Sequence, residues 1–258
     1  MLSFASAPAD QAWWIATLFI AARLGGLLLL APPLSATFVP GSVRVAVVLG
    51  LSVCLATMPS VHVTASPSLG FVVVGMATEV ALGATMALGV NLAFSAFAVG
   101  GRLLDVQIGF GMGQVFDPLT RQQLPVLSAA FNLLAIALFF ATDAHHLLLR
   151  GFALGLEILP PGGGWSVEHA AAPLTKQVAA TFSLGFVMVA PVVLCLLLVE
   201  LSLGVLSRNM PQMNMFALAV PIKVVVGVGT LALFVSALSS IGPRVNDSIF
   251  KAWEAMFR

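Results

Sequence analysis

Five charged residues interrupt long apolar runs and are the first candidates for chemistry. They are Arg23, Glu79, Asp105, Glu200 and Lys223. Ionisable side chains are costly inside a membrane and often mark proton or ion pathways, so one hypothesis is a small-molecule secondary transporter in which an acid and a cation form a charge relay. Such a transporter should carry an inverted repeat with paired broken helices, whereas the two halves of this chain differ in loop length and motif. The alternative for Glu79 is an acid hydrogen-bonded to a neighbouring helix, and the alternative for Arg23 is a side chain that faces other protein.

A second candidate is the sequence DAHH, in which Asp143, His145 and His146 carry side chains that can ligate a metal. Side chains at adjacent helical positions point in different directions, and the chain has no HExxH motif. We therefore expect a polar junction between helices here and no metal site. The run also lacks the Ser/His or paired-carboxylate arrangement of an intramembrane enzyme, so we expect no catalytic residues.

The third candidate is the central stretch from Gly100 to Pro125, the longest polar and glycine-rich interruption of the apolar sequence. Glycines alternate with bulky apolar residues in IGFGMG, which suits a short, shapeable constriction better than a regular helix. A dinucleotide-binding GxGxxG would need glycine where the chain has Gln114, and it should follow a strand. The competing interpretation is an ordinary loop between membrane helices.

Composition places the chain among integral membrane proteins. Of its 258 residues, 60% are hydrophobic and 8% charged, and the mean hydropathy is +1.07. Soluble proteins carry about 25% charged residues. The formal net charge of +1 gives no reason to expect nucleic acid, and no motif indicates a cofactor.

The apolar runs predict an all-α chain whose helices fit a bilayer poorly. We expect helices at about 13–30, 43–58, 69–99, 126–141, 147–159, 173–206 and 218–239, followed by an amphipathic helix from 241 to 258. The second run is short for a span of about 20 residues, and the third is too long unless it bends at Gly83 or Gly89 or protrudes. The positive-inside rule also gives a conflicting topology, because a spanning final hairpin would leave the basic tail outside. These helices therefore do not predict an ordinary bilayer-spanning bundle.

Three segments resemble the FliR family of flagellar export-gate proteins, which is related to the T subunit of virulence-associated type III secretion systems. They are GGRLLDVQIGFGMGQVFDP, LPVLSAAFNLLAIALFFATDAHH and, most specifically, SRNMPQMNMFALAVPIKVVVG. The resemblance implies a non-enzymatic subunit of the gate through which unfolded flagellar proteins leave the cytoplasm. It also implies FliP and FliQ as partners, service by FlhB and FlhA, contact with membrane lipids, and a place in the bacterial inner membrane at the flagellar basal body.

The family resemblance further implies a two-part fold and two sets of functional residues. Residues 1–172 would be a FliP-like helical part containing the loop at 100–125, and residues 173–258 a FliQ-like hairpin with its tail, assembled into a helical cone. The channel plug would be formed by Gln107, Ile108, Gly109, Phe110, Gly111, Met112, Gly113, Gln114, Val115, Phe116 and Asp117. Subunit packing would involve Arg23, Glu79, Glu200, Pro211, Gln212, Asn214, Phe216, Pro221 and Lys223. A ring of apolar side chains in the plug can block ions by dewetting and still yield to a polypeptide.

Overall fold

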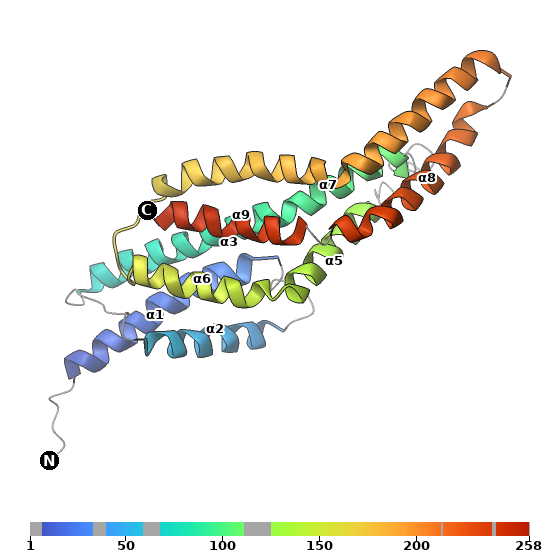
Figure 1. Ribbon diagram of the computed structural model, residues 1–258. Helices are drawn as coiled ribbons and strands as arrows, with labels where there is room; N and C mark the ends of the chain where they lie inside the picture. The colour runs from blue at the N-terminus through green and yellow to red at the C-terminus, as the bar shows by residue number, and fades with distance from the viewer. Residues whose placement is uncertain are drawn as a thin grey trace, which may run out of the picture. The chain divides into compact units, whose positions relative to one another are not determined.

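The protein is built from α-helices. The computed structural model describes residues 7–32, 40–58, 68–110, 125–212, 214–238 and 241–257, and regular structure among these is entirely helical (Figure 1). The helices are α1 (Ala7–Leu30), α2 (Gly41–Ala56), α3 (Leu69–Ile108), α5 (Val126–Ala141), α6 (Ala144–Ile158), α7 (Glu168–Asn209), α8 (Met215–Leu238) and α9 (Ile241–Phe257). Four of them are long and apolar enough to cross a membrane, and a fifth span is possible if α5 and α6 act as one. The prediction of an all-α membrane protein is confirmed.

Helix α3 corrects the expectation that an irregular stretch begins at Gly100. The helix runs for 40 residues without interruption and ends only at Ile108. Two glycines cost about 1 kcal/mol each of helix propensity, but LLDVQI after them contains neither glycine nor proline. Gly100 and Gly101 serve close packing: a Cβ on Gly101 would lie 2.6 Å from Cα of Ser128 on α5, and one on Gly100 would lie 3.1 Å from the carbonyl oxygen of Gly185 on α7. The glycines thus admit neighbouring backbones without breaking the helix.

Helix α7 also extends beyond its predicted start. It has 42 residues and begins at Glu168, so Pro173 lies inside the helix and not in its first turn. The amide of His169 donates to the carbonyl of Ser166, and the Glu168 carboxylate in the first turn favours the positive end of the helix dipole. These local contacts start the helix upstream of the proline.

The chain forms two compact units that are discontinuous in sequence. Unit 1 comprises Met1–Ala93, Asp143–Val178 and Asp247–Arg258, and unit 2 comprises Phe94–Thr142 and Ala179–Asn246. The predicted division after residue 172 separates a FliP-like part from a FliQ-like part. The two compact units do not test that likeness, and the division stays a prediction.

In unit 1, α1 crosses α3 at very short range. A Cβ on Gly83 of α3 would lie 2.1 Å from the carbonyl oxygen of Arg23, and one on Gly26 of α1 would lie 3.1 Å from the backbone nitrogen of Ala84. The crossing is surrounded by fully buried side chains, including Leu24. Small residues at a helix crossing let backbones approach closely, which is the usual way membrane helices gain packing energy.

The amphipathic helix α9 packs against unit 1 through its aromatic residues. Phe250 and Trp253 lie over Gly151 of α6, where an added Cβ would come within 3.0 and 3.4 Å of their rings. The indole N–H of Trp253 donates to the carbonyl of Met86 at 3.1 Å, and that of Trp165 donates to a carbonyl of α9 at 3.3 Å. The predicted buried face of this helix is confirmed, with Val245, Ile249, Trp253 and Met256 all buried.

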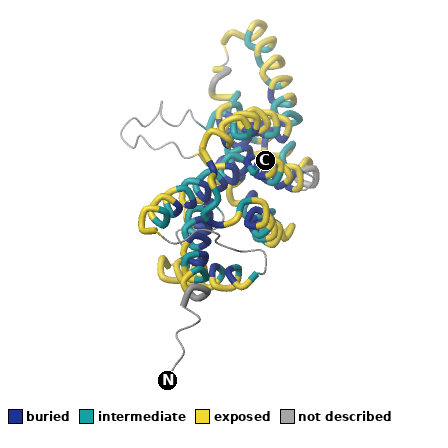
Figure 2. The backbone as a smooth tube through the Cα atoms, turned by 90° about the vertical axis from the view of Figure 1, so that its left-hand side faces the viewer, coloured by how far each residue is buried: buried dark blue, intermediate teal, exposed yellow. Residues whose placement is uncertain are grey.

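In unit 2, α7 and α8 form the predicted antiparallel hairpin (Figure 1). Figure 2 shows the outer end of this hairpin, at the top, coloured mostly as exposed. One face of α7 carries a row of exposed large apolar residues, namely Leu194, Leu198, Leu201 and Val205. A stripe of this spacing suits a surface covered by lipid or by another helix.

Candidate functional site

The end of α3 is joined to the start of α5 by a buried carboxylate. Asp105, 6% exposed, accepts hydrogen bonds from the backbone amides of Leu127 at 2.9 Å and Ser128 at 3.0 Å, and from the Ser128 hydroxyl at 2.8 Å. The first amides of a helix have no partners within it, and a carboxylate there satisfies them and favours the helix dipole. Pro125, at the N-cap of α5, makes no side-chain cap bond, so Asp105 supplies the cap from another helix. We call Asp105, Leu127 and Ser128 the Asp105 clamp.

The clamp lies at the base of the segment predicted to be a channel plug. Gly109 ends α3 with φ at 97°, a conformation that glycine adopts at little cost, and its amide donates to the carbonyl of Asp105. The chain therefore leaves α3 at Gly109 and enters α5 beside the same Asp105. Both ends of the segment between them are fixed by one residue.

Ile108, one of the predicted plug residues, is buried at the last position of α3. Its side chain is 1% exposed, and its Cδ1 lies 2.6 Å from where a Cβ on Gly227 of α8 would be. Because α3 extends to this residue, Ile108 is a packed core residue of unit 2. Its part in the plug stays a prediction.

The remaining plug residues are divided between the described and undescribed parts of the chain. Gln107 in the last turn of α3 and Phe110, two residues beyond that helix, are half-buried. The other predicted plug residues, Gly111, Met112, Gly113, Gln114, Val115, Phe116 and Asp117, lie outside the described residues. Their role stays a prediction.

A polar contact links the α7–α8 hairpin to the end of α3. Lys223 of α8 forms an ion pair with Glu200 of α7, and the Glu200 side chain is 41% exposed. The side-chain amide nitrogen of Gln107 lies 3.5 Å from the other carboxylate oxygen of Glu200. The three residues come from three helices of unit 2. The partial exposure of the pair means that it adds little to the stability of the chain alone, so its main effect is to fix the register of the two helices.

The predicted packing residues at the hairpin turn lie mostly at its surface. Pro211, Gln212 and Asn214 are exposed. The side-chain Oδ1 of Asn214 accepts a hydrogen bond from the amide of Ala217 at the start of α8. Pro221 lies inside α8. The side chain of Phe216 lies outside the described residues. Contact of this turn with another subunit stays a prediction.

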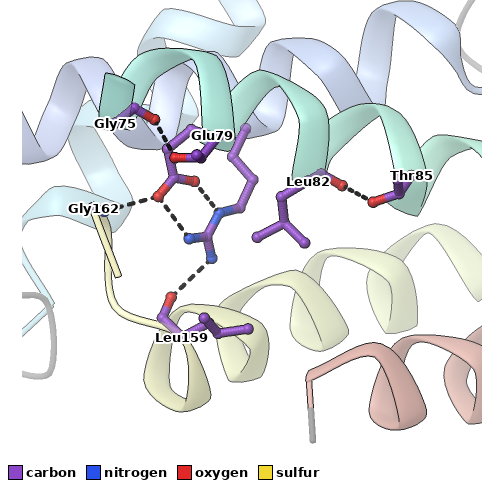
Figure 3. A network of polar contacts seen from close by, with 8 residues as sticks. Gly75, Glu79, Leu82, Thr85, Leu159 and Gly162 are labelled. Atoms are coloured by element: carbon purple, nitrogen blue, oxygen red, sulfur yellow. Dashed lines mark hydrogen bonds and ion pairs between the residues drawn. The ribbon is translucent and has the colours of Figure 1, made fainter. Parts of the chain in front are cut away.

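The other two predicted packing residues, Arg23 and Glu79, form a buried network inside unit 1. The guanidinium Nε and Nη2 of Arg23 donate to the two carboxylate oxygens of Glu79 at 2.5 and 2.9 Å, and both side chains are 2% exposed. Arg23 Nη1 donates to the carbonyl of Leu159 at 3.0 Å, and the amide of Gly162 donates to Glu79 at 2.9 Å (Figure 3). The network therefore joins α1, α3 and the connection between α6 and α7. Because Arg23 and Glu79 are buried, each finds its hydrogen-bond partners within this chain.

The hydrogen bonds of this network leave no oxygen of Glu79 without a donor, and this favours a structural role over the transporter hypothesis. Both oxygens of Glu79 accept hydrogen bonds, and the bidentate pair with Arg23 is the strongest geometry available to these side chains. An acid held in this way by a cation and a backbone amide has a structural part in the fold. The interpretation of Glu79 as an acid bonded to a neighbouring helix is the one that the geometry matches.

The expectation that the adjacent histidines diverge is wrong. The imidazole rings of His145 and His146 lie 4.1 Å apart between centroids and are tilted by 37°. Asp143 precedes them in a left-handed conformation with φ at 53°, and the three side chains can offer ligand atoms within 4.8 Å of one another. His145 and His146 are consecutive residues in the first turn of α6, and Asp143 immediately precedes that helix.

The sequence carries little or no signal for the clamp partner Ser128 and for the two backbone groups, at Leu159 and Gly162, that complete the buried network. Ser128 follows Pro125 at the start of a predicted helix, which is a weak capping signal. The backbone groups carry no sequence signal, because any residue has a carbonyl and nearly any has an amide.

Comparison with known proteins gives consistent matches along most of the chain. The family model described as "Bacterial export proteins, family 1" matches residues 14–247. A flagellar biosynthetic protein FliR from Pectobacterium carotovorum is 28% identical over 245 residues, covering 93% of this chain and 92% of the relative. The FliR of Bacillus subtilis is 31% identical over 163 residues, covering 62% and 63%. The surface presentation of antigens protein SpaR of Shigella sonnei is 27% identical over 218 residues, covering 84% and 82%.

Proposed function

The chain belongs to the bacterial export proteins, family 1, and we propose that it is a subunit of the flagellar type III export gate. The observation that carries the proposal is the match of the family model to residues 14–247, together with relatives of similar length named as flagellar biosynthetic proteins. In this role the chain assembles with FliP and FliQ, is served by FlhB and FlhA, and lies in the bacterial inner membrane at the flagellar basal body. It is a structural component through which unfolded flagellar proteins pass, and it performs no catalysis.

Within this gate, the segment after Gly109 acts as the channel plug. Phe110, Met112, Val115 and Phe116 provide apolar side chains that exclude water and ions, and the glycines between them let the segment yield. The Asp105 clamp supports this proposal, because a segment that must move repeatedly and return needs fixed ends. A buried carboxylate that caps α5 from α3 fixes the two described flanks of the segment.

The α7–α8 hairpin is proposed as the FliQ-like part. Its two long helices, its tight turn and its exposed apolar row on α7 support a role in packing against neighbouring subunits in a helical cone. The Glu200–Lys223 pair would hold the register on which that packing depends. The transporter alternative gains no support from the Arg23–Glu79 pair, because Glu79 has no unoccupied oxygen.

The proposal is tested by the composition of the complex that the full chain carries. The chain is extracted from its host membrane in mild detergent, and the co-purifying chains are identified by mass spectrometry. We expect FliP-like and FliQ-like chains in a defined assembly. A stable monomer or homodimer alone would contradict the export-gate function.

The plug assignment has its own test. Deletion of residues 109–113 should increase ion leakage across the membrane of cells whose gate is not exporting, because the apolar seal is shortened. A shortened segment with unchanged leakage, in a complex that still assembles, would refute the assignment.

A further inference from the structure

The turn between α5 and α6 gathers three side chains that the export function does not use. Asp143, His145 and His146 offer one carboxylate and two imidazoles, and their ligand atoms lie within 4.8 Å of one another. All three belong to unit 1 and lie in or beside the first turn of α6. A carboxylate with two imidazoles is a donor set that divalent transition metals, Zn²⁺ above all, bind readily.

The orientation of Asp143 is unusual for a residue at the start of a helix. An aspartate at an N-cap normally accepts from the free amides of the first turn, but Asp143 makes no side-chain cap bond. Its Oδ1 lies instead 3.6 Å from Nδ1 of His146. This separation is longer than a hydrogen bond, which spans about 2.7–3.2 Å. It is close to the distance of about 3.3 Å between two ligands of one tetrahedral Zn²⁺ with bonds of 2.0–2.1 Å.

The second imidazole lies on the same side of the turn. The ring centroids of His145 and His146 are 4.1 Å apart, so small side-chain rotations bring one nitrogen from each ring toward a shared point. His145 is half-buried, whereas the side chains of His146 and Asp143 are 72% and 76% exposed. An ion held here would keep at least one position open to water or to another ligand. The Asp143 carboxylate offsets the unfavourable charge that the helix N-terminus presents to a cation.

We propose that Asp143, His145 and His146 form a binding site for a divalent transition metal, with Zn²⁺ the best match to the donor set and spacing. The three ligands occur within four consecutive residues, so an ion would tie the first turn of α6 to the residue before it. The site is independent of the plug and of the proposed export function, and it can be tested on the purified chain.

The experiment uses the full-length chain, extracted in mild detergent without a polyhistidine tag, and titrates it with Co²⁺ and then with Zn²⁺ as a competitor. We expect about one Co²⁺ per chain, a visible absorption band from nitrogen and oxygen ligation, and loss of that band when Zn²⁺ is added. The variant D143N keeps a residue that tolerates the left-handed conformation and removes the carboxylate. Loss of even an outer partner of a metal site commonly costs 10–100-fold in affinity, so D143N and H146A should each weaken binding by about tenfold or more.

The matched control is H169A, which removes an exposed histidine bonded to Ser166 in a different part of unit 1. H169A should bind Co²⁺ as the unaltered chain does. The proposal is overturned if the unaltered chain binds no more tightly than an H145A/H146A variant, or if H169A weakens binding as much as D143N. Helical circular dichroism and the elution volume in detergent identify any variant that fails to fold. In that case the Co²⁺ affinity of D143N decides whether the proposed metal site stands.

Discussion

Removal of the Asp105 carboxylate should loosen the start of α5 and with it the base of the proposed plug. Asp105 accepts two backbone amides and one hydroxyl in a buried place. Hydrogen bonds to a charged group are worth about 1.5–3 kcal/mol, and loss of a helix cap costs about 0.5–2 kcal/mol. We expect D105A to lower the free energy of opening the first turn of α5 by about 2–4 kcal/mol, because the amides of Leu127 and Ser128 are left without acceptors.

Hydrogen exchange measures this opening directly. A change of about 1.4 kcal/mol is tenfold in an equilibrium constant, so amide exchange in peptides covering residues 126–130 should become roughly 30-fold to 1000-fold faster in D105A. S128A, which removes only the hydroxyl donor, should cost about 1 kcal/mol and raise exchange about fivefold. D247N is the matched control, since Asp247 is an exposed carboxylate. Unchanged exchange at the start of α5 in D105A would refute the account of the clamp.

The same variants separate the clamp from the plug. If the segment after Gly109 is the plug, D105A should also raise ion leakage through the idle gate, in the same order as the exchange rates. Faster exchange with unchanged leakage would leave the clamp as a purely structural cap and would count against the plug assignment.

Three further predictions concern the rest of the chain. G83A should lower the free energy of unfolding of the detergent-solubilised chain by about 2–3 kcal/mol or more, because the new Cβ would lie 2.1 Å from the carbonyl oxygen of Arg23. The control G70A should not lower it, because a Cβ on Gly70 would have no atom within 4 Å. Equal effects of the two variants would contradict the geometry of the α1–α3 crossing. E79Q should lower the same free energy by about 3–5 kcal/mol, because it leaves the buried Arg23 without its counter-charge. The double variant R23M/E79M should recover much of that loss. An E79Q variant as stable as the unaltered chain would show that the pair does not hold unit 1 together. K223A should change the stability of the isolated chain by less than about 1 kcal/mol but reduce the co-purification of partner chains. If K223A abolished secretion while the complex still purified intact, a role of Lys223 in assembly would be contradicted.

The elements predicted well were those whose ends are marked by local chemistry. Helix α5 begins after Pro125 and ends before Thr142, as its apolar run indicates. The buried face of α9 follows from its helical spacing alone. In both cases the property that decides the structure is contained within a few neighbouring residues.

The elements predicted poorly depend on contacts between distant segments. Gly100 and Gly101 look like helix breakers in sequence, and only the approach of α5 and α7 shows that they are packing points. Asp105 looks like a candidate for ion transport, and its true partners are amides 22 and 23 residues away. The close approach of the His145 and His146 rings depends on their side-chain rotamers, which the sequence does not specify. Sequence periodicity identifies a buried face but not the group that will meet it.

The contacts of α9 constrain the order in which the protein can mature during its synthesis. The carbonyl of Met86 receives its hydrogen bond from Trp253, which is 167 residues further along the chain. At about 5–20 residues per second, a ribosome needs roughly 8–33 seconds to make that distance. During this interval the face of α3 around Met86 and the small-residue surface of α6 at Gly151 lack their final cover. A nascent chain in this condition depends on the insertion machinery or on lipid to shield those surfaces, and unit 1, although it contains the earliest residues made, is among the last parts to be completed.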